Sequence, residues 1–157
     1  MKVAKMLAEL KQQIEGISQR NCKLIVLVGN SPALRGELVD TLCQELQSPA
    51  LVLGERLGVR LAEIPLQQRA LNVGTALREL CTEIAPNSPL VLDKIELLFD
   101  ASLQLNVLEV LKHQAMSRCV IVNWPGVWQS RHLVYAEIGH PEHRDYTAEG
   151  VVIQEIQ

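Results

Sequence analysis

The chain has 157 residues, with 15 basic and 18 acidic side chains and a formal net charge of −3. This length suits one domain with a complete hydrophobic core, and the composition excludes collagen, disorder and a mini-protein scaffold. No apolar run approaches the roughly 20 residues of a membrane-spanning helix, so we expect a cytoplasmic protein without a membrane partner. The small negative charge gives no general attraction for nucleic acid, so DNA contact would need a local patch.

The cysteines are expected to be reduced, small apolar side chains. Each lies inside an apolar run, and the spacing contains no CxxC pair and no nearby metal-ligand pair. The pattern therefore favours neither a redox site nor a metal site. The four residues are Cys22, Cys43, Cys81 and Cys119.

The first half of the chain alternates between two patterns. Residues 3–17 place apolar side chains at steps of four and three, which predicts an amphipathic helix. Residues 23–28 form a continuous, β-branched apolar run, typical of a strand buried on both faces. Leucines at every fourth position over 34–46 predict a second helix, and 50–53 a second strand. Together, the two strands and the helix between them form one βαβ unit.

The middle of the chain repeats this alternation. A glycine-containing link over 54–58 precedes a helix predicted over 66–84, and a strand follows over 90–92. A helical stretch with leucines over 105–111 leads to a fourth strand over 119–122. Four buried strands separated by helices predict a mainly parallel α/β sheet with helices on both faces.

The last part of the chain has a different texture. In segments 132–136 and 150–156, apolar and polar residues tend to alternate and do not form a continuous apolar run. We therefore expect two further strands at sheet edges. No second domain is visible. The predicted organisation is one domain over 1–157, with an N-terminal amphipathic helix over 1–20 and an α/β core over 21–157.

The turn after the first strand occupies the position of a phosphate-binding P-loop. A P-loop reads GxxxxGK followed by Ser or Thr, because glycine amides surround the phosphates, lysine neutralises them and the hydroxyl holds Mg²⁺. Aligned on Gly29, this chain has Leu34 for the second glycine, Arg35 for lysine and Gly36 for the hydroxyl. Only the first glycine and the positive charge remain.

The same turn has a purely structural interpretation. Ser31 followed by Pro32 is typical of a helix N-cap with proline at the first helical position. In that case the serine hydroxyl accepts from the helix amides that a phosphate would have used. Both interpretations stay open at this point.

Two more strand ends carry polar residues. Asp93 closes the third strand as a Walker B carboxylate would, but Lys94 stands where ATPases of the AAA+ kind place a catalytic Glu. Asn123 closes the fourth strand, where a sensor residue is common. Ligands bind beyond the carboxyl ends of such strands. The candidate nucleotide-binding set is Gly29, Asn30, Ser31, Arg35, Gly36, Asp93 and Asn123, and no catalytic residue is predicted.

Aromatic and basic residues gather between 124 and 146. Such a cluster could stack on nucleic acid and contact phosphates, or could form a protein-contact surface. The two histidines of the cluster lack a third ligand at a suitable spacing, so no metal site is predicted. The candidate interaction surface comprises Trp124, Trp128, Arg131, His140, His143 and Arg144.

The ordered motifs resemble the BrxF family, the small P-loop-containing proteins of BREX phage-defence systems. The resemblance runs from about residue 23 to 146, and its most specific parts are the block over 93–99 and the blocks from Trp-Pro-Gly to Gly-His-Pro-Glu. The motifs are Leu27-Val28-Gly29, Leu66 to Leu71 after Pro65, Leu92 to Asp100, Val122 to Gly126, Leu133 to Glu137 and Gly139 to Glu142.

The resemblance implies a three-layer, AAA+-like P-loop domain without a separate lid. It also implies a component of a multi-protein bacterial system that blocks phage replication and methylates host DNA. Gly29 and Arg35 then match the nucleotide loop, Asp93 the Walker B carboxylate and Asn123 the sensor.

The chain departs from the family's motifs at Leu34, Gly36 and Lys94, and these departures lead to one main hypothesis and two alternatives. Because the P-loop is degenerate, we expect a scaffold or regulatory subunit with weak or no ATP hydrolysis, whose partners are other BREX proteins. The first alternative is an ATP-driven switch that oligomerises and is completed by a neighbouring subunit. The second is a DNA-contacting module that uses the aromatic segment. We expect no bound cofactor, and the alternative is that the protein binds ATP and Mg²⁺. Formation of a homo-oligomer is a further possibility that the sequence does not decide.

Overall fold

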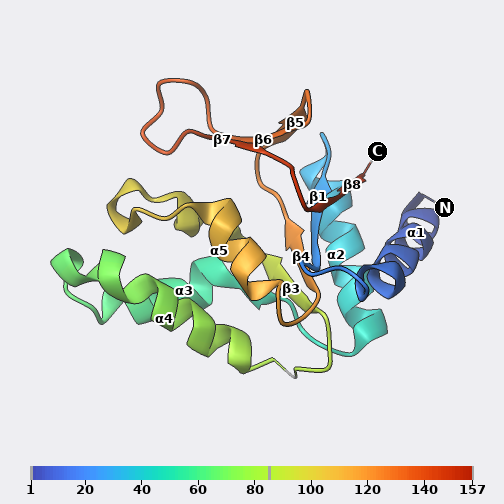
Figure 1. Cartoon of the computed structure of the whole chain (residues 1–157), viewed down its shortest axis with the longest axis horizontal. Coiled ribbons are helices and arrows are strands. Elements are labelled where there is room, and N and C mark those ends of the chain that lie inside the picture. Colours follow the sequence, from blue (N-terminus) through green and yellow to red (C-terminus); the bar gives the residue numbers. More distant parts are fainter. Residues whose placement is uncertain (1, 85, 157) are drawn as a thin grey trace.

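The computed structural model describes residues 2–84 and 86–156, so both ends of the predicted domain, Met1 and Gln157, lie outside the described residues. Within them the chain forms a five-stranded sheet, a three-stranded sheet and helices around the larger sheet (Figure 1). The helices are α1 (Lys2–Ile17), α2 (Pro32–Leu46), α3 (Leu53–Ala62), α4 (Arg69–Thr82) and α5 (Val107–Gln114), with short 3-10 turns η1 (Leu66–Gln68), η2 (Ile95–Phe99) and η3 (Ala101–Leu103). The strands are β1 (Leu24–Val28), β2 (Leu51–Val52), β3 (Leu90–Asp93), β4 (Val120–Asn123), β5 (Val127–Gln129), β6 (His132–Tyr135), β7 (Arg144–Thr147) and β8 (Val152–Glu155).

The larger sheet has the order β2-β3-β4-β1-β8, and every neighbouring pair is parallel. Successive side chains of a strand point to opposite faces. In β1 this sends Leu24, Val26 and Val28 into one core cluster, whereas Ile25 and Leu27 join another. All five side chains are therefore buried, which explains the continuous apolar run in the sequence.

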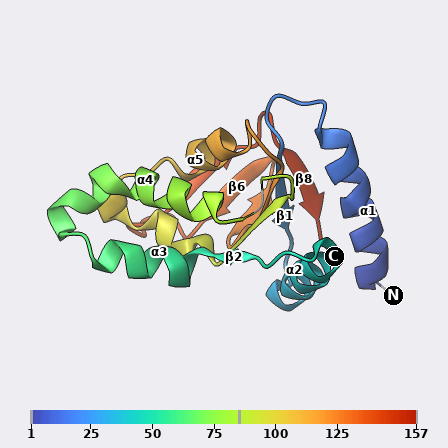
Figure 2. The same cartoon turned by 90° about the horizontal axis from the view of Figure 1, so that it is seen from below.

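Helices cover both faces of this sheet. The cluster on one face includes side chains of α1 and α2, and the cluster on the other includes side chains of α3, α4 and α5. Figure 2 shows the same division, with α1 and α2 together on one side of the strands. The predicted α/β fold with a mainly parallel sheet is confirmed, and this architecture is compatible with a P-loop-like fold.

The glycine-containing link predicted over 54–58 is wrong, because α3 begins directly after β2. Leu53, Leu57 and Leu61 follow one another every fourth residue and are buried against the sheet, and this burial outweighs the low helix propensity of glycine. Gly54 also has a packing role, since a Cβ there would lie 3.4 Å from the carbonyl oxygen of Lys94.

The smaller sheet, in the order β5-β6-β7, is antiparallel. Segment 132–136 was expected at a sheet edge, but β6 is the middle strand of this second sheet. A two-residue turn at Ser130 and Arg131, both with positive φ, joins β5 to β6, as the twist of hairpins favours. The expectation for 150–156 is confirmed, since β8 forms an edge of the larger sheet beside β1.

Among the described residues, no helix combines the length and the apolar character that crossing a bilayer would need. The longest helix, α1, is amphipathic: Leu7, Leu10 and Ile17 are buried against the core, whereas polar side chains of the same helix are exposed.

Candidate site at the carboxyl edge of the parallel sheet

The polar residues predicted at three strand ends lie at the same edge of the sheet. Strands β3, β4 and β1 are parallel neighbours, so Asp93, Asn123 and the turn that starts at Gly29 all follow their carboxyl ends. The chain leaves β1 toward β2 on one side and leaves β4 toward β8 on the other side. Ligands of open α/β sheets bind at such a reversal of direction.

Arg35 connects these residues into one hydrogen-bonded chain. It lies in the first turns of α2 with only 5% of its surface exposed. Its Nε donates to Asn123 Oδ1 at 2.9 Å, and its Nη1 donates to the carbonyl oxygen of Gly29. Asn123 Nδ2 then donates to Asp93 Oδ1 at 3.1 Å. The predicted lysine-equivalent, sensor and Walker B positions are therefore in direct contact.

The electrostatics of this chain are dominated by burial. Burial lowers the pKa of the Arg35 guanidinium from its ordinary value, and the nearby charge of Asp93 acts in the opposite direction. Asp93 Oδ1 also accepts from the backbone N–H of Lys94 at 2.9 Å. Lys94 itself has a φ of 53°, and its carbonyl accepts from Gly54 at 3.0 Å, so the turn after β3 is anchored on α3.

The turn between β1 and α2 is a helix cap, as the structural interpretation predicts. Ser31 is the N-cap residue, and its hydroxyl accepts from the N–H of Leu34 at 3.1 Å. Pro32 occupies the first helical position, and the N–H of Arg35 donates to the Ser31 carbonyl at 3.1 Å. The serine side chain is thus engaged with the helix itself.

The two glycines of this region differ in what they require. A Cβ on Gly29 would lie 2.2 Å from the carbonyl oxygen of Ile156. Ile156 follows β8, and its N–H donates to the carbonyl oxygen of Val28 at 2.7 Å. No atom lies within 4 Å of the Cβ position of Gly36. Close approach of the C-terminal segment therefore explains Gly29, whereas packing does not explain Gly36.

A cavity of about 430 Å³ adjoins the same turn. One wall is the β1–α2 turn with Arg35, and the opposite wall comes from the start and the end of the β5–β6 hairpin. Apart from Asn30, Arg35 and Glu137, its lining is apolar or glycine. The lining residues are Gly29, Asn30, Pro32, Arg35, Pro125, Gly126, Val127, Val134, Ala136 and Glu137.

The prediction that Trp124 forms part of an interaction surface is wrong. Its exposed fraction is 0%, its Nε1 donates to the Val134 carbonyl at 3.2 Å, and its ring meets Phe99 edge-on at 5.5 Å. Tyr135 stacks on Phe99 at 3.9 Å, and Tyr146 meets Trp124 at 6.4 Å. The segment after β4 therefore brings three aromatic rings, two of them half-buried, into one cluster with Phe99 of η2.

The other residues predicted for that surface are spread over the smaller sheet. Trp128 is half-buried and packs against the core, and Arg131 is exposed in the β5–β6 turn. His140 Nδ1 accepts from the N–H of Glu142, whereas His143 Nδ1 donates to the carbonyl of Ala136 at 3.1 Å. These side chains support the loop between β6 and β7.

Arg144 completes this set at the start of β7, where its Nη1 donates to the carbonyl of His143 at 2.9 Å. No group of three His, Cys, Asp or Glu side chains in the described part of the chain is arranged to hold a metal ion.

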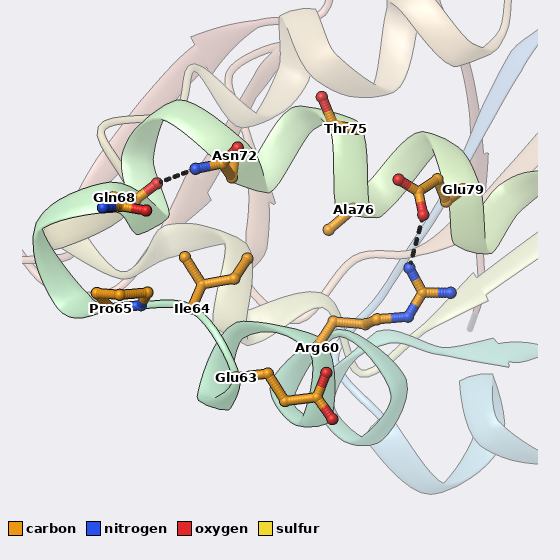
Figure 3. Close-up of a pocket in the computed structure, with 9 residues that line it drawn as sticks. All are labelled: Arg60, Glu63, Ile64, Pro65, Gln68, Asn72, Thr75, Ala76 and Glu79. Carbon is orange, nitrogen blue, oxygen red and sulfur yellow. Dashed lines mark hydrogen bonds and ion pairs between the residues drawn. The ribbon is translucent and has the colours of Figure 1, made fainter.

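Two further features were not predicted. On the smaller sheet, His132 Nδ1 lies 2.5 Å from Asp145 Oδ1. In the sequence, the one signal for the strand that carries this aspartate is the alternation of side-chain types over residues 144–147. A second cavity, of about 440 Å³, lies between α3 and α4, where Arg60 and Glu79 reach toward each other at 3.1 Å (Figure 3). An exposed ion pair of this kind contributes about 0–1 kcal/mol to stability.

No protein-family model, curated protein sequence or solved structure matches this chain.

Proposed function

We propose that this protein is a P-loop-like subunit of a BREX-type phage-defence system, which binds partner proteins and hydrolyses ATP weakly or not at all. The observation that supports it most directly is the partly buried hydrogen-bonded chain from Gly29 through Arg35 and Asn123 to Asp93. The defence setting rests on the resemblance of residues 23–146 to the BrxF family.

The geometry makes phosphate binding costly at this position. The Nε and Nη1 atoms of Arg35 already donate to Asn123 and Gly29, so a two-point contact with a phosphate through these atoms would break hydrogen bonds, and unsatisfied buried polar groups cost about 1–3 kcal/mol each. The Ser31 hydroxyl is engaged in capping the helix. Lys94 follows Asp93 where a catalytic carboxylate would be needed, and an ammonium group cannot accept a proton from the attacking water.

Calorimetry tests the nucleotide part of the proposal. ATP and ADP would be titrated into the full chain with and without Mg²⁺, with Arg35→Ala as the control. We expect no specific heat of binding and no hydrolysis above background. Mg²⁺-dependent hydrolysis that disappears in Asp93→Ala would overturn the proposal.

Genetics tests the defence part. In a bacterium whose BREX-type locus encodes this chain, deletion of its gene should lower phage resistance, host methylation or both. Complementation with Asp93→Ala should restore the phenotype, because the proposed role does not use hydrolysis. A deletion that leaves both resistance and methylation intact would contradict the assignment.

One observation favours a second candidate, an ATP-driven oligomerising switch. The cavity of about 430 Å³ beside Gly29 and Arg35 lies within the size range of small-molecule sites. This candidate predicts that ATP binds in the calorimetric experiment and raises the molecular mass seen in solution, and that Arg35→Ala removes both effects. The DNA-contacting alternative is less favoured, because the buried Trp124 is not accessible for stacking on a base.

A further inference from the structure

The carboxyl edge of the sheet contains a buried positive charge with only neutral acceptors. The guanidinium of Arg35 donates to the Gly29 carbonyl and to the Asn123 amide oxygen. Among the described residues no carboxylate forms an ion pair with it, and its Nη2 has no hydrogen bond. Asp93 acts on this charge through space and through Asn123, but it does not contact the guanidinium directly. Because buried charges in proteins are normally paired directly, the guanidinium has a position open for an anion.

The cavity beside this guanidinium contains one more polar side chain of the same turn, Asn30, whose amide group is a hydrogen-bond donor. Pro32 has no N–H, and the N–H groups of Leu34 and Arg35 are used within the cap. The positive end of the helix dipole favours an anion here.

We propose that this cavity receives the carboxylate of a glutamate or aspartate side chain, flanked by apolar residues, from a partner protein. This inference rests on the proposed function as a partner-binding subunit. A carboxylate can pair with the guanidinium of Arg35, and Asn30 brings a side-chain amide donor to the same wall of the cavity. Pro125, Val127 and Val134 line the cavity, and Val127 is 49% exposed, so apolar neighbours of the acidic residue have a surface to cover.

Glu137 explains why a carboxylate fits better than a phosphate. This residue also lines the cavity and is exposed, so its charge repels an incoming anion. A phosphate monoester carries a charge of about −1.5 to −2, and its repulsion is greater than that of a singly charged carboxylate.

Nuclear magnetic resonance on the full chain tests the proposal with defined probes. The peptide acetyl-Val-Glu-Val-amide is titrated against acetyl-Val-Gln-Val-amide, which has the same shape without the charge. We expect the acidic peptide to shift the backbone signals of residues 29–35 and 125–137 and the Nε–H signal of Arg35. The neutral peptide should bind about tenfold more weakly, because it leaves the buried charge unpaired.

Two variants make the experiment specific. Arg35→Gln should abolish the difference between the peptides. Glu137→Gln is a surface substitution that leaves the core intact, and it should tighten binding of the acidic peptide by removing a repulsive charge. Equal binding of both peptides, no saturable shift with either, or no effect of Glu137→Gln would overturn the proposal.

Inorganic phosphate and Mg²⁺-ATP form the competing arms. If either displaces the acidic peptide at lower concentration than the peptide itself binds, the site prefers phosphate and the proposal fails. The two proposals fail separately: ATP hydrolysis would contradict the proposed function, whereas a silent peptide titration with no ATP binding would contradict the carboxylate site alone.

Discussion

The two sheets of this protein use their faces differently. In the parallel sheet, β1 is buried along its whole length, and β3 and β4 become partly exposed only at their last residues, Asp93 and Asn123. In the antiparallel sheet, β5 and β7 alternate between exposed and half-buried side chains. A sheet covered on both faces confines polar chemistry to its strand ends, whereas a sheet covered on one face displays polar side chains along its length.

The contrast also separates two kinds of charged contact. Arg35 is buried and belongs to a chain of hydrogen bonds that reaches Asp93. His132 and Asp145 form an exposed pair on the smaller sheet, with side-chain exposures of 41% and 50%. The second contact is more exposed to solvent than the first, so equivalent substitutions in the two regions should have unequal effects on stability.

The largest expected effect tests how the two sheets are joined. Trp124→Ala should lower the free energy of unfolding by about 3–5 kcal/mol, because it empties the core beside Phe99 and leaves the Val134 carbonyl without its donor. Trp128→Ala, at a half-buried position on β5, should lower the free energy of unfolding by clearly less than Trp124→Ala does. Urea unfolding followed by circular dichroism measures both, and equal losses would show that Trp124 does not link the sheets.

The next effect sharpens the comparison at the β1–α2 turn. Gly29→Ala should destabilise the protein by about 1–3 kcal/mol, because the new methyl group would meet the Ile156 carbonyl. Gly36→Ala is the matched control inside α2, where no atom lies within 4 Å of the new Cβ. It should stabilise the helix by about 0.5–1 kcal/mol. Thermal unfolding of the two variants in parallel should show shifts of opposite sign.

A third experiment compares the buried chain with the exposed pair. Asn123→Ala removes the partner of both Arg35 and Asp93 and should cost about 1–3 kcal/mol of unfolding free energy. His132→Ala breaks the contact with Asp145 and should cost at most about 1 kcal/mol. An Asn123→Ala variant no less stable than His132→Ala would contradict the structural role of the buried chain.

The last effect concerns two thiols, Cys81 in the core and the half-buried Cys119, and it is negligible at neutral pH. Burial raises the pKa of Cys81 and of Cys119 to about 11, and Arg118 acts weakly in the opposite direction. An unfolded thiol ionises near pH 8.5, roughly. The folded state therefore retains protons that the unfolded state releases, and the associated stability is complete below that pH and lost as pH rises toward 11.

Unfolding experiments between neutral and alkaline pH would measure this loss. The slope of unfolding free energy against pH should be smaller in Cys81→Ala. At pH 8, iodoacetamide should alkylate both thiols slowly, roughly in proportion to the small fraction of each that is thiolate. Rapid alkylation of Cys81 in the folded protein would contradict its burial.

Much of the carboxyl edge could be predicted from the sequence because parallel topology constrains it. Buried runs ending at Val28, Asp93 and Asn123 identify strand ends, and parallel strands bring those ends to one edge. The N-cap at Ser31 was predictable for a local reason, since its hydrogen bond spans three residues. The close contact of Ile156 with Gly29 was not, because it joins segments from opposite ends of the chain.

The sequence alone determined the four buried strands along the chain, the buried faces of most helices except α3, and the polar residues that end the strands, because each depends on short-range periodicity. Tertiary structure alone decided where Trp124 points, how β5, β6 and β7 form a separate sheet, and that the buried charge of Arg35 lies beside a cavity. These outcomes depend on which distant surfaces meet, and burial energy depends on the partner surface as well as on the side chain.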